Sequence, residues 1–447
     1  MAAWTGVEND ADVRAALSWF ASASGNPLAF WARLKAAQAA YREFTGLPEN
    51  FGRTPQLEQT SADVVAAFLA QGKSLLDSLR TYDHHLASKT IPWLKQIGSK
   101  IDALDSVSGA KERAASMLSK PTVRPDSSLL ELTMAANYAD DGGDVSFVDE
   151  APGVARRPDL LLAGDNGDPS IGIELKRLNA GAYETEERRF QAAIFREVAI
   201  LIERLGLSVH IDVAYTSELV NVPVTYLAKW LEIAVATRVY VGAAYPWRDE
   251  HGQGTIKFAD VDAVRADIRD SSLYVGPKLA RLLSGEVVRE TNYQLAVGAE
   301  PDERDPRYIS ELRYGSVVTW ESISPAALEK RARIVKAKLI EAGRQLKAQE
   351  YGIVHLVTDT ELLCQSSDLR RSKNQDVIKS FRPESKLVGI YVHYLVPRVS
   401  EQHSWLLDET VDSFGPGLVP VPMIKAFPEA PTVANDQPAW RQSIPLR

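Results

Sequence analysis

Apolar positions in the first 120 residues recur at the three- and four-residue spacing of amphipathic helices. This spacing covers 11–23, 28–45, 61–82 and 91–118, and turn formers at 25–27 and in the loop 46–55 interrupt it. From about residue 127, short apolar or alternating runs typical of strands separate the helical segments. The pattern predicts an α/β protein with a helical N-terminal domain (1–120), a core (121–245), an α/β extension (246–414) and a proline-rich extended tail (415–447).

Within the predicted core, two short strands flank a dense cluster of turn formers. The first, 158–163, opens with a proline, and the second, about 170–177, alternates so that Glu174 and Lys176 share the face opposite its apolar side chains. An antiparallel hairpin brings Asp159 close to Glu174, within about 6 Å, where both carboxylates can hold one hard divalent cation. Lys176 then points at the same place.

The residues Pro158, Asp159, Glu174, Leu175 and Lys176 resemble the motif of the PD-(D/E)xK nuclease superfamily, which includes restriction endonucleases and repair exonucleases. The resemblance implies a restriction-endonuclease-like mixed sheet flanked by helices. It also implies that Asp159 and Glu174 bind Mg²⁺ or Mn²⁺, with the carbonyl of Leu175 as a further ligand, and that Lys176 positions or activates the attacking water.

The segments around the motif follow the superfamily order of helix, three strands, helix and strand over about 125–217. In this order the helix 127–139 comes before the first strand, 144–150, and the helix 187–205 comes before the last strand, 208–216. The superfamily commonly carries a further glutamate on the first helix, which corresponds here to Glu131. Gln191 and Phe195 resemble the Gln-x-x-x-Tyr element of one branch, with phenylalanine in place of tyrosine. Gln191, with Arg188 or Arg189, is expected to face the substrate.

The chain carries a formal net charge of -8, which argues against a broadly basic surface for nucleic acid. The net charge does not exclude a local basic groove. The helical segment 326–349 holds seven Lys or Arg against two Glu, and Arg331, Arg333 and Lys336 are candidate phosphate contacts. A solvated helix face is the alternative interpretation.

The remaining composition excludes several classes of protein. Cys364 is the only cysteine, so intrachain disulfides and thiolate zinc cages are excluded, and no Walker loop is present. No basic leader or long apolar run occurs, which indicates a cytoplasmic protein without a membrane segment. The 447 residues are enough for two or three domains, and the N-terminal helices are expected to pack, to dock a partner protein or to form a homo-oligomer.

The sequence therefore predicts a metal-dependent nuclease that hydrolyses phosphodiester bonds in DNA. A regulated role in defence against phage or in DNA processing rests on analogy alone. Two alternatives stay open. One is a non-catalytic scaffold or nucleic-acid-binding module that retains the nuclease fold. The other is an RNase that uses the same site, since two acids and a metal act on either backbone.

Overall fold

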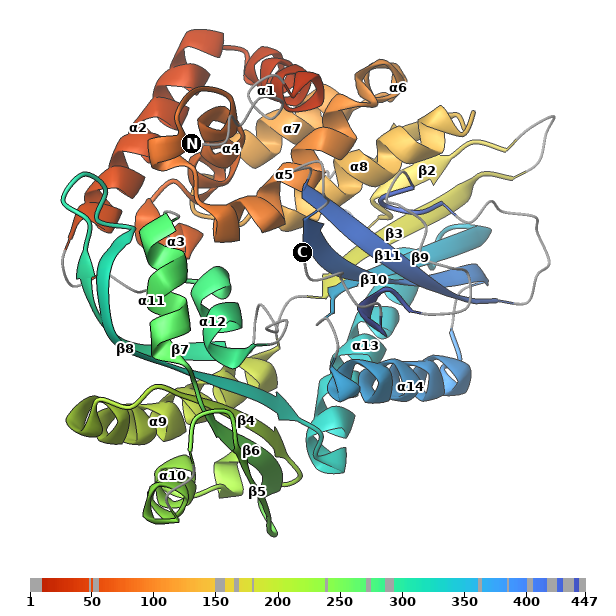
Figure 1. The fold of residues 1–447 in the computed structure, drawn as a ribbon. Helices are drawn as coiled ribbons and strands as arrows, with labels where there is room; N and C mark the ends of the chain where they lie inside the picture. Colours follow the sequence, from red (N-terminus) through yellow and green to blue (C-terminus); the bar gives the residue numbers. More distant parts are fainter. Residues whose placement is uncertain are drawn as a thin grey trace.

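The computed structural model describes residues 10–47, 50, 56–148, 157–164, 169–178, 181–237, 240–270, 275–285, 293–360, 364–383, 386–399, 405–415, 424–428 and 438–441. Figure 1 shows a helical layer at the top, one sheet on the right and a second sheet at the lower left. Both sheets are mixed and flanked by helices, so the prediction of a mixed α/β architecture is confirmed. Within the described part of the chain, no helix combines the length and apolarity needed to cross a membrane.

The N-terminal layer is helical where it is described. Capping explains several helix starts, since the side chains of Asp10, Asn26 and Asp63 each accept a backbone N–H in the first turn that follows. The predicted helix 91–118 is instead broken near Gly98 and at Gly109, which has φ +84°. The helices of the layer are α1 (Ala11–Ala23), α2 (Pro27–Gly46), α3 (Leu57–Thr60), α4 (Val64–Asp77), η2 (Leu79–Thr81), α5 (His84–Gly98), α6 (Ile101–Ser106), α7 (Ala110–Leu118) and α8 (Asp126–Asp140).

The first sheet, sheet A, has the strand order β1-β2-β3-β9-β10-β11. The strands β3, β9 and β10 run parallel to one another, and the other neighbouring pairs are antiparallel. Helices α5 and α8 contact one face, and α13 (Pro325–Gln345), followed by α14 (Gln365–Ser380), covers the other (Figure 1). The strands are β1 (Val145–Phe147), β2 (Leu160–Leu162), β3 (Ile171–Leu178), β9 (Tyr351–Asp359), β10 (Leu387–Val399) and β11 (Trp405–Phe414).

The second sheet, sheet B, has the order β5-β6-β4-β8-β7, and only β4 and β8 are parallel neighbours. Its strands are β4 (Val209–Tyr215), β5 (Ala244–Arg248), β6 (Gly252–Phe258), β7 (Tyr293–Pro301) and β8 (Ile309–Ser322). The accompanying helices are α9 (Ala182–Leu205), η4 (Leu219–Asn221), α10 (Tyr226–Ala236), α11 (Val261–Asp270) and α12 (Pro277–Ser284).

The structure corrects one element of the predicted core. The strand predicted at 208–216 exists as β4, but it lies in sheet B and does not continue the sheet that contains β3. The parallel neighbour of β3 is β9, which the chain reaches through α13. Sheet B and its helices therefore lie, in sequence, between β3 and the helix that crosses over to β9.

The proline-rich tail is more deeply held than an extended surface segment would be. In its described parts, Phe427 packs into the core under the N-terminal helices, and Trp440 of η5 (Ala439–Arg441) packs into the core under α13 and α14. Both parts are bound to the edge strand β11, because Phe427 N donates to Glu409 and Ala439 N donates to Thr410. The tail therefore contacts both faces of sheet A beside its last strand.

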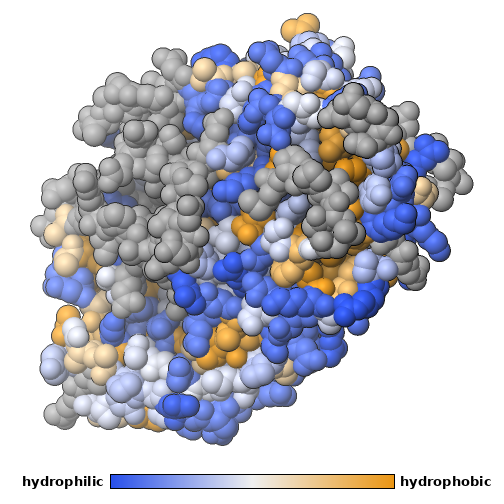
Figure 2. All heavy atoms as spheres, turned by 90° about the vertical axis from the view of Figure 1, so that its right-hand side faces the viewer, coloured by the Kyte–Doolittle hydropathy of each residue, from blue (hydrophilic) through white to orange (hydrophobic). Residues whose placement is uncertain are grey.

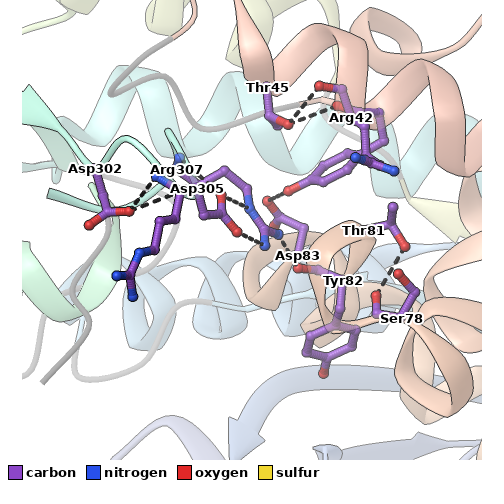
Figure 3. Close-up of polar contacts among 11 residues, drawn as sticks. Arg42, Thr45, Ser78, Thr81, Tyr82, Asp83, Asp302, Asp305 and Arg307 are labelled. Atoms are coloured by element: carbon purple, nitrogen blue, oxygen red, sulfur yellow. Dashed lines mark hydrogen bonds and ion pairs between the residues drawn. The ribbon is translucent and has the colours of Figure 1, made fainter.

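A largely buried arginine side chain joins the helical layer to sheet B (Figure 3). Arg307, from the turn between β7 and β8, donates to the carbonyl of Tyr82 at 2.8 Å and pairs with Asp305 at 2.6 Å. Beside it, Tyr41 donates to Asp83 at 2.7 Å. These contacts fix the β7–β8 hairpin against α2 and the start of α5.

Candidate active site

The two predicted metal ligands face each other across the β2–β3 hairpin. Leu160 pairs with Ile173 in antiparallel register, so one step further along places Asp159 opposite Glu174. The Leu175 N–H donates to Asp159 Oδ2 at 2.8 Å, which fixes the orientation of this carboxylate. The two carboxyl groups are near enough for each to affect the pKa of the other. The hairpin prediction is confirmed.

Glu174 is a buried acid that lacks conventional donors. Its side chain is 0 % exposed, and neither carboxylate oxygen receives a hydrogen bond of good geometry. Its partner is the Lys176 ammonium, 2.5 Å from Oε1. Burial and then the negative charge of Asp159 raise the pKa of Glu174 to about 8, although Lys176 opposes the shift.

Asp159 is shifted in the same direction. Burial raises its pKa, while the Leu175 N–H and the charges of Lys176 and Arg113 oppose that rise. Two adjacent carboxylates of raised pKa can form a hydrogen bond only when one carries a proton. A shared proton or a bound cation would therefore relieve the repulsion within the pair.

Lys176 is held by helix α13. Its ammonium contacts Gln345 Oε1 at 2.8 Å and Glu341 Oε1 at 3.2 Å, in addition to Glu174. Burial would lower the pKa of Lys176, but the acidic neighbours outweigh this and raise it. The lysine is therefore charged and kept in one place by groups from two elements.

A glycine allows α13 to come this close to the strand. A Cβ on Gly172 would lie 2.7 Å from Gln349 Cγ and 2.9 Å from Leu346 Cδ2, both in the turn that follows α13. A larger residue at this position of β3 would require these side chains to move. Gly172 thus helps to bring Glu341 and Gln345 to Lys176.

Glu131 lies near the acid pair but is already bound. It is 5 % exposed on α8 and forms an ion pair with Arg113 of α7. Its charge adds to the effects that raise the pKa of Glu174. Its predicted catalytic role stays a prediction, and Arg113 is a neighbour that no sequence pattern indicated.

Gln191 does not face this site, and that prediction is wrong. It is 1 % exposed on α9, where it accepts from Tyr215 at 2.8 Å and donates to Gln294 at 3.0 Å. These partners belong to sheet B. Arg188 and Arg189 are exposed on the same helix, and Arg189 pairs with Glu186, so their contact with nucleic acid stays a prediction.

The basic face of α13 is only partly available. Arg331 is 12 % exposed and bound to the buried Glu187 of α9 at 2.7 Å, so it serves to join the two helices. Removing one partner would leave the other charge buried and unpaired. Arg333 and Lys336 are exposed, as a phosphate-binding surface requires. The view in Figure 2 mixes hydrophilic and hydrophobic side chains over the described surface.

Two carboxylates are enough for a magnesium ion that keeps several of its waters. Among the described residues there is no group of three or more His, Cys, Asp or Glu side chains arranged to hold a metal. Mg²⁺ commonly keeps several waters and binds through one or two carboxylates. The donor-poor oxygens of Glu174 and the fixed carboxylate of Asp159 meet that requirement.

Comparison with known proteins gave no match: no protein-family model, curated protein or solved structure is significantly similar to this chain. The functional interpretation therefore depends on the residues and geometry described above.

Proposed function

We propose that the protein is a Mg²⁺-dependent nuclease of the PD-(D/E)xK type that hydrolyses phosphodiester bonds in DNA. The observation that carries this proposal is the pair formed by the fully buried Glu174 and the partly buried Asp159, since burial raises the pKa of both carboxyl groups. A structural acid pair would be expected to acquire donors, since unsatisfied buried carboxylates are costly. A divalent cation supplies the missing positive charge.

The order of elements supports the proposal. In sheet A the chain runs α8, β1, β2, β3, α13 and β9, which resembles the superfamily order of helix, three strands, helix and strand. In this interpretation, sheet B and its helices form a large insertion before α13. Large additions of this kind suit a regulated nuclease, in defence or DNA processing within the cytoplasm.

The proposal assigns a separate role to each residue of the site. Asp159 and Glu174 would hold Mg²⁺, which when bound lowers the pKa of a coordinated water and neutralises charge on the scissile phosphate. Lys176 would orient the water or stabilise the developing negative charge. Gln345 and Glu341 keep the ammonium in reach of both acids. Arg333 and Lys336 would contact the backbone phosphates.

The test is incubation of the full chain with plasmid DNA, single-stranded DNA and RNA, each with Mg²⁺, Mn²⁺ or EDTA. We expect metal-dependent cleavage of DNA that EDTA abolishes. Cleavage of RNA alone would support the RNase alternative. Binding of nucleic acid without cleavage under every condition would support the scaffold alternative. Cleavage that persists undiminished in Glu174→Gln would show that the acid pair does not carry the activity.

A further inference from the structure

Arg177 lies one residue beyond Lys176 and therefore on the opposite face of sheet A. Its side chain is 5 % exposed, and its guanidinium carbon lies 5.9 Å from the ring centroid of Trp93 on α5. Trp93 in turn packs edge-on against Phe427 of the tail at 4.9 Å. The guanidinium is thus held over an aromatic ring, on the side of the sheet away from the acid pair.

The donors of Arg177 are mostly unused. Asp359 Oδ1 accepts from Nη2 at 2.5 Å, but Nε and Nη1 are buried without a hydrogen-bond partner. A guanidinium has five N–H groups arranged as two forked edges that share Nη2. One carboxylate oxygen on Nη2 therefore leaves a complete fork open. Leaving such donors unsatisfied inside a protein costs free energy. If Arg177 had a purely structural role, we would expect these donors to have partners.

The partner of Arg177 stands at the surface. Asp359 ends β9, beside the carboxyl end of the parallel strand β3, and its side chain is 64 % exposed. The positive charges of Arg177 and Lys89 lower the pKa of this carboxyl group. The exposed carboxylate marks the side from which a ligand can reach Arg177.

We propose that Arg177, with Lys89 nearby, binds a phosphate group that displaces the Asp359 carboxylate from the guanidinium. A phosphate carries more negative charge than a carboxylate and has three acceptor oxygens, so it can fill the open fork of Arg177. Trp93 keeps the guanidinium plane fixed for such a bidentate contact. This site is separate from the acid pair and does not depend on the nuclease proposal.

The phosphate can belong to a small nucleotide or to a nucleic-acid backbone. Calorimetric titration of the full chain in EDTA, at constant ionic strength set with chloride, distinguishes them. The ligands are inorganic phosphate, a nucleoside monophosphate and a short DNA oligonucleotide without terminal phosphate. Inorganic phosphate should bind. Tighter binding of the nucleotide identifies a small-molecule site, and tighter binding of the oligonucleotide identifies a backbone contact.

Two variants should change phosphate affinity in opposite directions. Arg177→Gln removes the fork and should weaken binding by at least about tenfold. Asp359→Asn removes the competing carboxylate and its repulsion, and should strengthen binding several-fold. Arg313→Gln, at an exposed arginine of β8, is the matched control and should leave the affinity unchanged.

The proposal fails if phosphate neither binds the wild type nor raises its melting temperature above that in matched chloride. It fails equally if Arg177→Gln binds as well as wild type. Should Arg177→Gln not fold, Asp359→Asn decides alone, because affinity equal to or below that of wild type would show that Asp359 is not a competitor for the site.

Discussion

Glu174 combines complete burial with a second acid as its neighbour, and this combination has consequences that can be measured without any substrate. In the unfolded chain its carboxyl group ionises near the usual pKa of 4.5, whereas in the folded chain the pKa is about 8. Between these values the folded state keeps a proton that the unfolded state has lost. The free energy of unfolding should therefore fall as the pH rises from about 4.5 to about 8.

Urea unfolding of the metal-free protein at a series of pH values measures this fall. Glu174→Gln should flatten it, because the amide does not titrate. Saturating Mg²⁺ should oppose it in the wild type, since metal binding to ionised carboxylates stabilises the folded state. An equally steep fall in Glu174→Gln would assign the titration to another group.

The same substitution tests catalysis. Glu174→Gln keeps the size of the side chain and removes the charge proposed to hold the metal, so cleavage should fall by about two orders of magnitude or more. The melting temperature without metal should hold or rise, because a buried charge and its repulsion with Asp159 are removed. Lys176→Ala should also abolish cleavage but leave Mg²⁺ binding, followed by calorimetry, largely intact. Wild-type rates in both variants would contradict the site.

At the scale of elements, α13 links sheet B to the candidate site. Its first half binds α9 through Arg331 and Glu187, and its second half holds Lys176 through Glu341 and Gln345. Gln345→Ala should lower kcat more than it raises KM, because the lysine loses a positioning contact while substrate binding elsewhere is retained.

Glu341→Gln tests the charged contact from the same helix, and Glu329→Gln, at an exposed glutamate near the start of α13, is its matched control. The ion pair with Glu341 contributes to the raised pKa of Lys176. Removing that charge should move the alkaline limb of the pH–rate profile to lower pH in Glu341→Gln but not in Glu329→Gln. Identical profiles in the two variants would leave Glu341 without a positioning role.

The prediction about nucleic-acid binding concerns the exposed residues of α13. Arg333→Glu with Lys336→Glu should weaken DNA binding and reduce its salt dependence by about one unit of slope per lost phosphate contact. Arg331 is left unchanged because its replacement would leave the buried Glu187 without its ion-pair partner. Binding measured by fluorescence anisotropy at several salt concentrations provides the slope, and an unchanged slope would assign this face to solvent.

At the scale of the molecule, Arg307 is the contact through which the helical layer holds the β7–β8 hairpin. Arg307→Ala should destabilise the protein by about 3 kcal/mol, since it removes one partner of a largely buried pair and leaves Asp305 uncompensated. Arg313→Ala, at an exposed ion pair of β8, should cost less than about 1 kcal/mol. Chemical denaturation compares the two, and equal small losses would show that the junction carries little of the stability.

The sequence by itself determined the local features of this protein. Helix limits in the first layer follow from N-capping residues and from the spacing of apolar residues. Helix α1, for example, coincides with the predicted segment 11–23. The hairpin that places Asp159 opposite Glu174 follows from a proline, a turn cluster and the two-residue alternation of strands. These features involve residues close together in the chain, so short-range geometry is enough to specify them.

Only the tertiary structure decided which distant elements meet. Nothing in the alternation of 208–216 distinguishes a neighbour of β3 from a neighbour of β8, because parallel pairing depends on how whole layers pack. The same limit applies to Gln345, which meets Lys176 across 169 residues, and to Gln191, which the sheet B core buries. Arg177 and Asp359 likewise come together only because β3 and β9 are paired in parallel. Burial, and with it every shifted pKa of the site, is a property of the packed layers.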